Sequence, residues 1–161
     1  MKVIFLDIDG VLCIHAPDGN WGAEDDDVLS ADCCRRLKEI LDATGCKLVL
    51  SSSWRLFREN VRSLFAQLRP FGITRADFLG GTPLLEERGE EILAWLARHP
   101  LVGRFIALDD EPFDSVRFPR ERLVLTEPAS GITEAVKTRC VALLNDEKSH
   151  TSCKNENEQQ L

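Results

Sequence analysis

The chain has 161 residues and a formal net charge of −7, because its 27 Asp and Glu residues outnumber its 20 Lys and Arg residues. At about 150 residues per domain, this length predicts one compact domain and excludes a multidomain enzyme. The negative charge repels phosphate backbones and disfavours nucleic acid as a partner. Hydrophobic residues make up 43% of the chain, but no apolar run is long enough to span a bilayer, so we expect neither a membrane anchor nor a signal peptide.

The chain begins with a short apolar run, residues 2–6, that is rich in β-branched and aromatic side chains. An unbroken apolar run of this length predicts a strand buried on both faces of a parallel sheet. It leads into Asp7-Ile8-Asp9-Gly10. From residue 11 to residue 29 the pattern dissolves into Pro, Gly and acidic residues, which predicts a loop or a small hairpin flap. Such an insert can cover a site but cannot fold alone.

Two strand-loop-helix units are then predicted. Ser30 is typical of a helix N-cap, and apolar residues at helical spacing follow it as far as Gly45. Residues 46–50 predict a second buried strand, which runs directly into the three serines at 51–53. Apolar residues at helical spacing then predict a second helix that ends at Pro70.

The second half of the chain continues the alternation. It comprises an irregular stretch (71–85), a helix (87–98), a strand (104–108) that ends in Asp109-Asp110, a short strand (123–125) and a closing helix (132–144). Strands that alternate with helices predict an α/β fold in three layers, a Rossmann-like parallel sheet of about five strands between helices.

Residues 145–161 differ in composition from the rest. They hold one aliphatic residue among many Asn, Glu, Gln, Lys and Ser residues, so they cannot bury enough surface to offset the entropy of ordering them. We expect a single domain over residues 1–144 and a disordered polar tail over residues 145–161.

The six cysteines show no spacing that is typical of a metal site or a redox pair. They are Cys13, Cys33, Cys34, Cys46, Cys140 and Cys153, without a C-x-x-C pair or a Cys/His cluster of zinc-finger spacing. We therefore expect free thiols and a cytoplasmic protein, because a reducing cytosol keeps thiols free.

Polar side chains follow three of the predicted strands at the point where each strand ends. Asp7 and Asp9 follow the first strand, Ser51 the second, and Asp109-Asp110 a third. In an open α/β sheet, ligands bind outside the carboxyl ends of the strands, so these side chains are expected to converge. Hard oxygen ligands without a nearby His or Cys favour Mg²⁺, whose remaining positions water and phosphate can fill. Taken singly, each segment has a simpler interpretation as a turn, a helix cap or solvated acids.

These segments resemble the haloacid dehalogenase (HAD) superfamily. Residues 5–12 are similar to its first motif, in which an apolar strand delivers D-x-D followed by Gly and aliphatic residues. Residues 48–51 are similar to the second motif, apolar residues that end in Ser or Thr, and residues 105–110 to the acidic fourth motif. The resemblance runs from residue 2 to about residue 144, and the first motif is its most specific part.

The resemblance implies a phosphatase that works through an aspartyl-phosphate. Asp7 would attack phosphorus, and Asp9 would protonate the leaving oxygen and then deprotonate the attacking water. The metal ligands implied are Asp7, the backbone carbonyl of Asp9 and one or both of Asp109 and Asp110, with Asp110 as the preferred direct ligand. Ser51 would hydrogen-bond a phosphoryl oxygen, helped by backbone N–H groups where the next helix starts.

Four further residues complete the implied site. Ser52 replaces Ser51 if the strand ends one residue later. The third family motif is a Lys or Arg, and no lysine lies between residues 47 and 137, so the resemblance implies an arginine. Arg88, followed by Gly89 at the start of a predicted helix, stands where the family usually has Lys-Gly; the alternative is a solvated surface arginine. Trp54 and Arg55 are expected to form a wall of the substrate entrance, although Trp54 also fits simple packing.

The gaps between the motifs are too short for a cap domain, and capless members of the superfamily commonly act on bulky substrates. The stretches at 51–55 and 88–96 also resemble small HAD domains of RNA-repair assemblies and of stand-alone bacterial proteins. We expect a Mg²⁺-dependent phosphomonoesterase that acts on an accessible phosphoprotein or small molecule rather than on nucleic acid. The alternatives are a phosphatase of 3′-phosphorylated polynucleotide ends, a receiver-like phosphoacceptor domain and a non-catalytic binding module.

Overall fold

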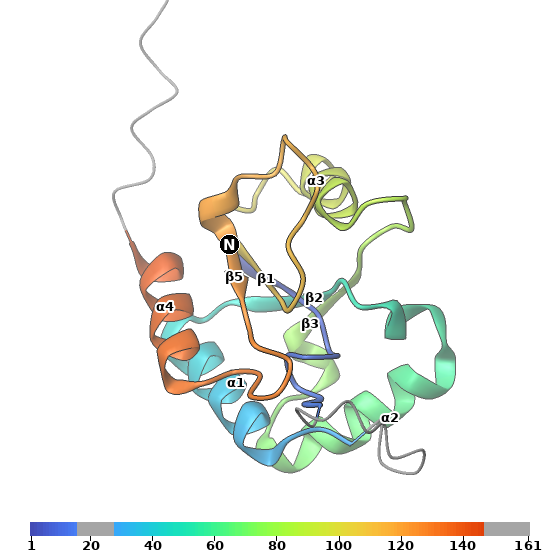
Figure 1. Cartoon of the computed structure of the whole chain (residues 1–161), viewed down its shortest axis with the longest axis vertical. Helices are drawn as coiled ribbons and strands as arrows, with labels where there is room; N and C mark the ends of the chain where they lie inside the picture. Colours follow the sequence, from blue (N-terminus) through green and yellow to red (C-terminus); the bar gives the residue numbers. More distant parts are fainter. Residues whose placement is uncertain (16–27, 147–161) are drawn as a thin grey trace, which may run out of the picture.

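The computed structural model describes residues 1–15 and 28–146 (Figure 1). The centre of the expected flap (residues 16–27), nearly all of the expected tail (residues 147–161) and Cys153 lie outside the described residues. Within them, none of the helices is long and apolar enough to cross a membrane. The five described cysteines are buried free thiols, as their spacing predicts.

A parallel sheet forms the centre of the described part of the chain. Its strands are β1 (Lys2–Leu6), β2 (Lys47–Leu50), β3 (Phe78–Gly81), β4 (Arg104–Asp109) and β5 (Leu123–Leu125), in the order β3-β2-β1-β4-β5. The chain moves outward from β1 to β3 and then returns to the other side of β1 for β4 and β5. The direction of winding therefore switches beside β1, which is where open α/β sheets bind ligands. The predicted three-layer α/β fold is confirmed.

Helices cover both faces of the sheet (Figure 1). They are α1 (Ala31–Thr44), α2 (Arg58–Leu68), α3 (Arg88–Ala97) and α4 (Glu134–Asn145). At the start of α1 the Ser30 side chain accepts a hydrogen bond from the Cys33 backbone N–H, and Gly45 ends the helix with a φ of 65°. Ser30 and Gly45 thus act as the predicted caps, because glycine adopts this left-handed conformation without strain.

Alternation along the strands divides the interior into two cores. Ile4 and Leu6 face α1, α2 and α4 and join a large aliphatic core. Val3 and Phe5 face the other way, and with Ile92 and Trp95 of α3 they form a smaller, more aromatic core. Because side chains along a strand alternate between faces, the residue that follows Leu6 belongs to the α3 side.

The prediction that residues 71–85 are irregular is wrong for part of this stretch. Strand β3 lies within it at the edge of the sheet, with Leu48 opposite Phe78 and Leu50 opposite Gly81. A four-residue strand with two glycines and three exposed positions has no hydrophobic periodicity to reveal it. Pairing with β2, rather than local propensity, forms this strand.

Candidate active site

Asp7, Ser51 and Asp109 lie side by side at the carboxyl edge of the three central strands. The Asp7 backbone N–H donates to the Leu108 carbonyl at 3.0 Å, and the Ser51 N–H donates to the Leu6 carbonyl at 2.9 Å, so both residues continue the sheet. Asp7, Ser51 and Asp109 are 5%, 1% and 2% exposed. Alternation directs Asp7 and Asp109 to the α3 face, where α3 begins.

Arg88, the first residue of α3, connects two of these acids. Its Nη1 lies 2.8 Å from Asp7 Oδ1 and 2.7 Å from Asp109 Oδ2. The helix starts here because the Glu87 side chain accepts a hydrogen bond from the Glu90 N–H at 2.8 Å. Among the described residues both contacts use Nη1, so the Nε and Nη2 N–H groups of the guanidinium can donate to another anion. The structure thus brings the predicted third-motif arginine to the predicted nucleophile.

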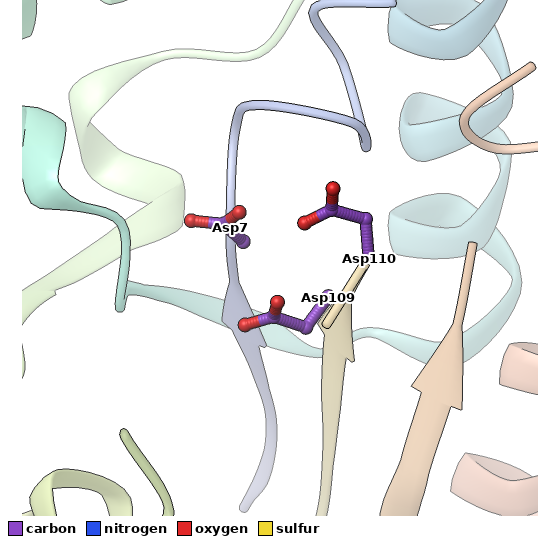
Figure 2. A group of neighbouring side chains, drawn as sticks. All are labelled: Asp7, Asp109 and Asp110. Carbon is purple, nitrogen blue, oxygen red and sulfur yellow. The ribbon is translucent and has the colours of Figure 1, made fainter. Parts of the chain in front are cut away.

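Three carboxylates gather at the ends of β1 and β4, as Figure 2 shows. One oxygen from each of Asp7, Asp109 and Asp110 lies within 4.8 Å of the others. Asp109 is engaged on both oxygens, because Oδ1 accepts from the Glu111 N–H at 3.0 Å and Oδ2 accepts from Arg88. Carboxylate oxygens this close repel one another, and a divalent cation that prefers oxygen ligands relieves the repulsion.

Burial gives the carboxylates unusual proton affinities. Burial, and then repulsion by the Asp7 carboxylate, raise the pKa of Asp109 to about 7. Burial also raises the pKa of Asp7, although the charge and hydrogen bond of Arg88 act in the opposite direction. The pKa of Asp110 is raised by burial and by Asp7. The cluster therefore retains protons to higher pH than ordinary carboxylates do, which is typical of sites that bind a cation or perform catalysis.

The turn after β1 fits closely around Asp110. Gly10 has a φ of 69°, and a Cβ atom at this position would lie 2.3 Å from Asp110 Oδ2. The Thr126 hydroxyl donates to the Gly10 carbonyl at 2.8 Å and ties the turn to the end of β5. Glycine is needed here for the backbone conformation and for the close approach of Asp110. The Asp-Gly pair in the sequence indicated the turn, but nothing in it indicated Thr126.

Asp9 contacts Trp54. The Trp54 indole Nε1 donates a hydrogen bond to Asp9 Oδ2 at 3.1 Å, and the indole is buried. Trp54 lies in the short 3-10 helix η1 (Ser53–Leu56), whose N-cap is Ser52. The Ser52 side chain also hydrogen-bonds the Asp7 carboxylate, which contributes to lowering the pKa of Asp7 against the effect of burial. Trp54 thus contacts a candidate catalytic acid as well as packing, a contact that sequence reasoning missed.

Arg55 has partners within the protein on every side. Its guanidinium donates to Glu91 and to the backbone carbonyls of Ser51, Ser52, Thr82 and Pro83 at 2.8–3.2 Å. The Arg55 side chain is 9% exposed, and that of Glu91 is 6% exposed. Sequence reasoning missed Glu91; its position four residues before Trp95, on the buried face of the predicted helix, was the available signal.

A family model described as "HAD domain in Swiss Army Knife RNA repair proteins" matches residues 3–136. The chain belongs to this HAD family. The resemblance inferred from the motifs is therefore confirmed, and it supports a hydrolase of the HAD superfamily, whose domains generally use Mg²⁺. The comparison with curated proteins and the comparison with solved structures each found no match.

An open pocket of about 340 Å³ leads to the site of this HAD domain. Arg88 and Asp109 are among the residues that line it. Its walls are formed by the apolar residues Leu56, Leu84, Leu85, Pro112 and Phe113 and by acids that include Glu86, Glu111 and Asp114. The pocket thus offers apolar surface and negative charge beside Arg88.

Proposed function

We propose that the protein is a Mg²⁺-dependent phosphomonoesterase that forms an aspartyl-phosphate on Asp7. The observation that carries the proposal is the position of Asp7 at the switch point of the sheet, where it contacts the Arg88 guanidinium and gathers with two further carboxylates. A phosphoryl group carries negative charge on three oxygens, so it needs cations on several sides when a carboxylate approaches it. Arg88 and a metal ion at the acidic cluster would supply them.

The acidic residues fit Mg²⁺, which takes one or two carboxylates and leaves other positions to water and phosphate. Asp7 and Asp110 would hold it directly, together with the Asp9 carbonyl that the family resemblance implies. Asp109 is held on both oxygens by protein donors, which favours a place behind the direct ligands. When bound, the metal would neutralise charge on the phosphoryl group and on Asp7.

Two residues of the chain would carry out the chemistry in two steps. An Asp7 oxygen attacks phosphorus, the bond to the leaving oxygen breaks, and Asp9 gives that oxygen its proton. Asp9 then takes a proton from water, which attacks the phosphorus of the aspartyl-phosphate and restores the Asp7 carboxylate. The Trp54 N–H donates to Asp9 Oδ2, so it would orient this carboxyl for the two proton transfers.

Ser51 and Arg88 would bind the phosphoryl oxygens. Arg88 keeps N–H donors beyond those that contact Asp7 and Asp109, and its planar fork suits phosphate. The Ser52 side chain caps η1 and contacts Asp7, which favours Ser51 as the hydroxyl donor to phosphate. Arg55 is better explained by the contacts that it makes within the protein than by contact with substrate.

The pocket favours a phosphoprotein or a small phosphorylated molecule as substrate, and the free thiols of the described cysteines favour a cytoplasmic location. Glu86, Glu111 and Asp114 are exposed at its walls, and they would repel the successive phosphates of a polynucleotide. Its apolar residues would accept an apolar or aromatic leaving group. The gaps between the motifs are too short for a cap domain, so the site would admit such a group on a large molecule.

The proposal is tested by hydrolysis of an aryl phosphate with and without Mg²⁺. We expect metal-dependent turnover in the wild type, with a loss of at least a thousandfold in Asp7→Asn and Asp9→Asn, and wild-type turnover in Asp42→Asn, an exposed acid far from the site. A loss of less than tenfold in Asp7→Asn would rule out the covalent mechanism. Lasting phosphorylation of the protein without turnover of the aryl phosphate would favour a receiver-like domain. Binding of the phosphate ester with neither turnover nor phosphorylation of the protein would favour a binding module.

The family description favours a second candidate, a phosphatase of RNA ends, because it names RNA repair proteins. The two candidates are separated by comparing phosphopeptides with 3′-phosphorylated oligonucleotides at equal concentration and low salt. We expect higher kcat/KM for peptides with basic flanking residues. Glu86→Lys with Asp114→Lys should lower that preference and raise activity on the oligonucleotide. A wild-type preference for the oligonucleotide would reverse our choice of substrate.

A further inference from the structure

Arg55 makes an unusually complete set of contacts for an arginine beside an active site. Its five N–H groups meet five acceptors: Nε donates to Thr82 O, Nη1 to Ser51 O and Ser52 O, and Nη2 to Pro83 O and Glu91 Oε1. A guanidinium carries five donors, so no donor remains for a substrate.

Glu91 completes the same network from α3. Its Oε1 also accepts a hydrogen bond from the Leu85 N–H at 3.0 Å, and its Oε2 accepts one from the Thr82 hydroxyl at 3.3 Å. A Cβ atom on Gly81 would lie 3.2 Å from Arg55 Cδ, so a glycine at the end of β3 leaves room for the arginine. The ion pair is thus enclosed by the segments that it connects.

The connected segments are those that carry the phosphate-binding groups of the proposed function. Ser51 and Ser52 form the loop after β2, and Glu91 lies one helical turn after Arg88. Residues 82–85 form the segment called the pocket wall here, because its Leu84 and Leu85 line the pocket. Small displacements of groups that bind the reacting phosphoryl have large effects on rate. The Arg55 side chain contacts the serine loop, the pocket wall and α3 together.

We propose that Arg55 and Glu91 are positioning residues that fix the serine loop and the pocket wall relative to Arg88. This inference rests on the proposed phosphatase function, and it replaces the expectation that Arg55 itself contacts substrate. The pair acts through backbone carbonyls and one carboxylate, so its effect should fall on the rate of phosphoryl transfer more than on the affinity for substrate.

The test separates positioning from stability with the double variant Arg55→Met/Glu91→Leu. Replacing a buried ion pair by apolar residues of similar volume is often neutral for stability, but it removes all five donors. We expect a melting temperature close to the wild type, a kcat for aryl phosphate lower by about tenfold to a hundredfold and a KM within about threefold. Arg55→Lys, with three donors for five acceptors, should give an intermediate kcat. Arg58→Met, at the exposed first position of α2, is the matched control and should leave both constants unchanged.

A second measurement, amide hydrogen exchange over residues 51–56 and 82–85, does not depend on activity. We expect faster exchange of both segments in the double variant and, to a smaller degree, in Arg55→Lys. A folded double variant with wild-type kcat overturns the proposal. If the double variant does not fold, wild-type kcat and exchange in Arg55→Lys overturn it.

The two proposals fail in different ways. If the wild type has no metal-dependent turnover, the phosphatase function is wrong, and exchange alone decides whether Arg55 and Glu91 hold the two segments. Unchanged exchange in the double variant then overturns the positioning role.

Discussion

Arg55 and Arg88 both line the pocket, and each contacts buried carboxylate groups, yet their surroundings differ. The Arg88 side chain is 28% exposed and uses a single nitrogen to contact two acids whose pKa values are raised. The Arg55 side chain is 9% exposed and uses all three nitrogens on one carboxylate and four carbonyls. An arginine with spare donors can donate to a further anion once a metal ion balances the neighbouring acids, whereas an arginine whose donors are all used suits the connection of loops.

The largest expected effect concerns stability around Arg55. Arg55→Met alone leaves the Glu91 carboxylate buried without its cation, so we expect the free energy of unfolding to fall by about 3–5 kcal/mol. Urea denaturation of the variant and the wild type measures this difference in the free energy of unfolding. The double variant Arg55→Met/Glu91→Leu should recover most of that loss because no uncompensated charge remains. A loss below about 1 kcal/mol in the single variant would mean that the pair contributes little to the fold.

Arg88→Met should affect activity instead. We expect kcat for aryl phosphate to fall by about a hundredfold to a thousandfold, the usual cost of removing one donor that stabilises transition-state charge. The unfolding free energy should change less than in Arg55→Met, because the two acids facing Arg88 can take up protons once the cation is gone. Arg88→Lys should keep part of the activity. If Arg88→Met lost stability as Arg55→Met does, the distinction between the two arginines would fail.

Gly10→Ala tests the close approach of Asp110. Alanine must adopt a φ of 69°, which costs about 1–3 kcal/mol, and its Cβ must also displace the Asp110 carboxylate. Gly45→Ala is the matched control, since Gly45 has a φ of 65° and a Cβ added there would meet no atom of the described residues within 4 Å. We expect both variants to lose stability, but only Gly10→Ala to lose Mg²⁺-dependent thermal stabilisation. Equal Mg²⁺ responses in the two variants would remove Asp110 from the set of direct ligands.

The smallest effect is a pH dependence of Mg²⁺ binding. Burial and repulsion by Asp7 raise the pKa of Asp109 to about 7, so below this pH a metal ion must displace protons from the cluster. The affinity for Mg²⁺ should therefore rise as the pH rises through about 7, by roughly tenfold per unit for each proton displaced. Calorimetric titrations from about pH 5.5 to 8 measure this, and Asp109→Asn should flatten the profile.

The same shift has a consequence for the metal-free protein. Asp109 titrates near 3.8 when unfolded and near 7 when folded, so the folded state binds more protons between these values. Stability without metal should therefore decrease as the pH rises across this window. A metal-free melting temperature that rises with pH through the same range in the wild type, but not in Asp109→Asn, would contradict the raised pKa.

Much of the architecture was predictable because its causes are local. The Ser30 and Gly45 caps, the buried runs of β1, β2 and β4 and the acids that follow them can all be identified from neighbouring residues. Strand β3 was missed because its two glycines carry no pattern, and β2 alone provides its pairing. The Trp54–Asp9 and Thr126–Gly10 hydrogen bonds were missed because their partners are 45 and 116 residues apart.

The sequence by itself determined that acids and a serine follow predicted parallel strands. Because parallel strands direct their carboxyl ends to one edge of the sheet, the order of the elements was enough to predict that these side chains converge. The sequence does not show how the surroundings differ within three pairs of like residues: Ser51 and Ser52, Asp109 and Asp110, and Arg55 and Arg88. The tertiary structure decided these, because the acceptors that saturate Arg55 and the acids that face Arg88 come from segments distant in the chain. An arginine in a sequence carries five donors wherever it stands, and only the packing of other segments around it determines how many remain for a ligand.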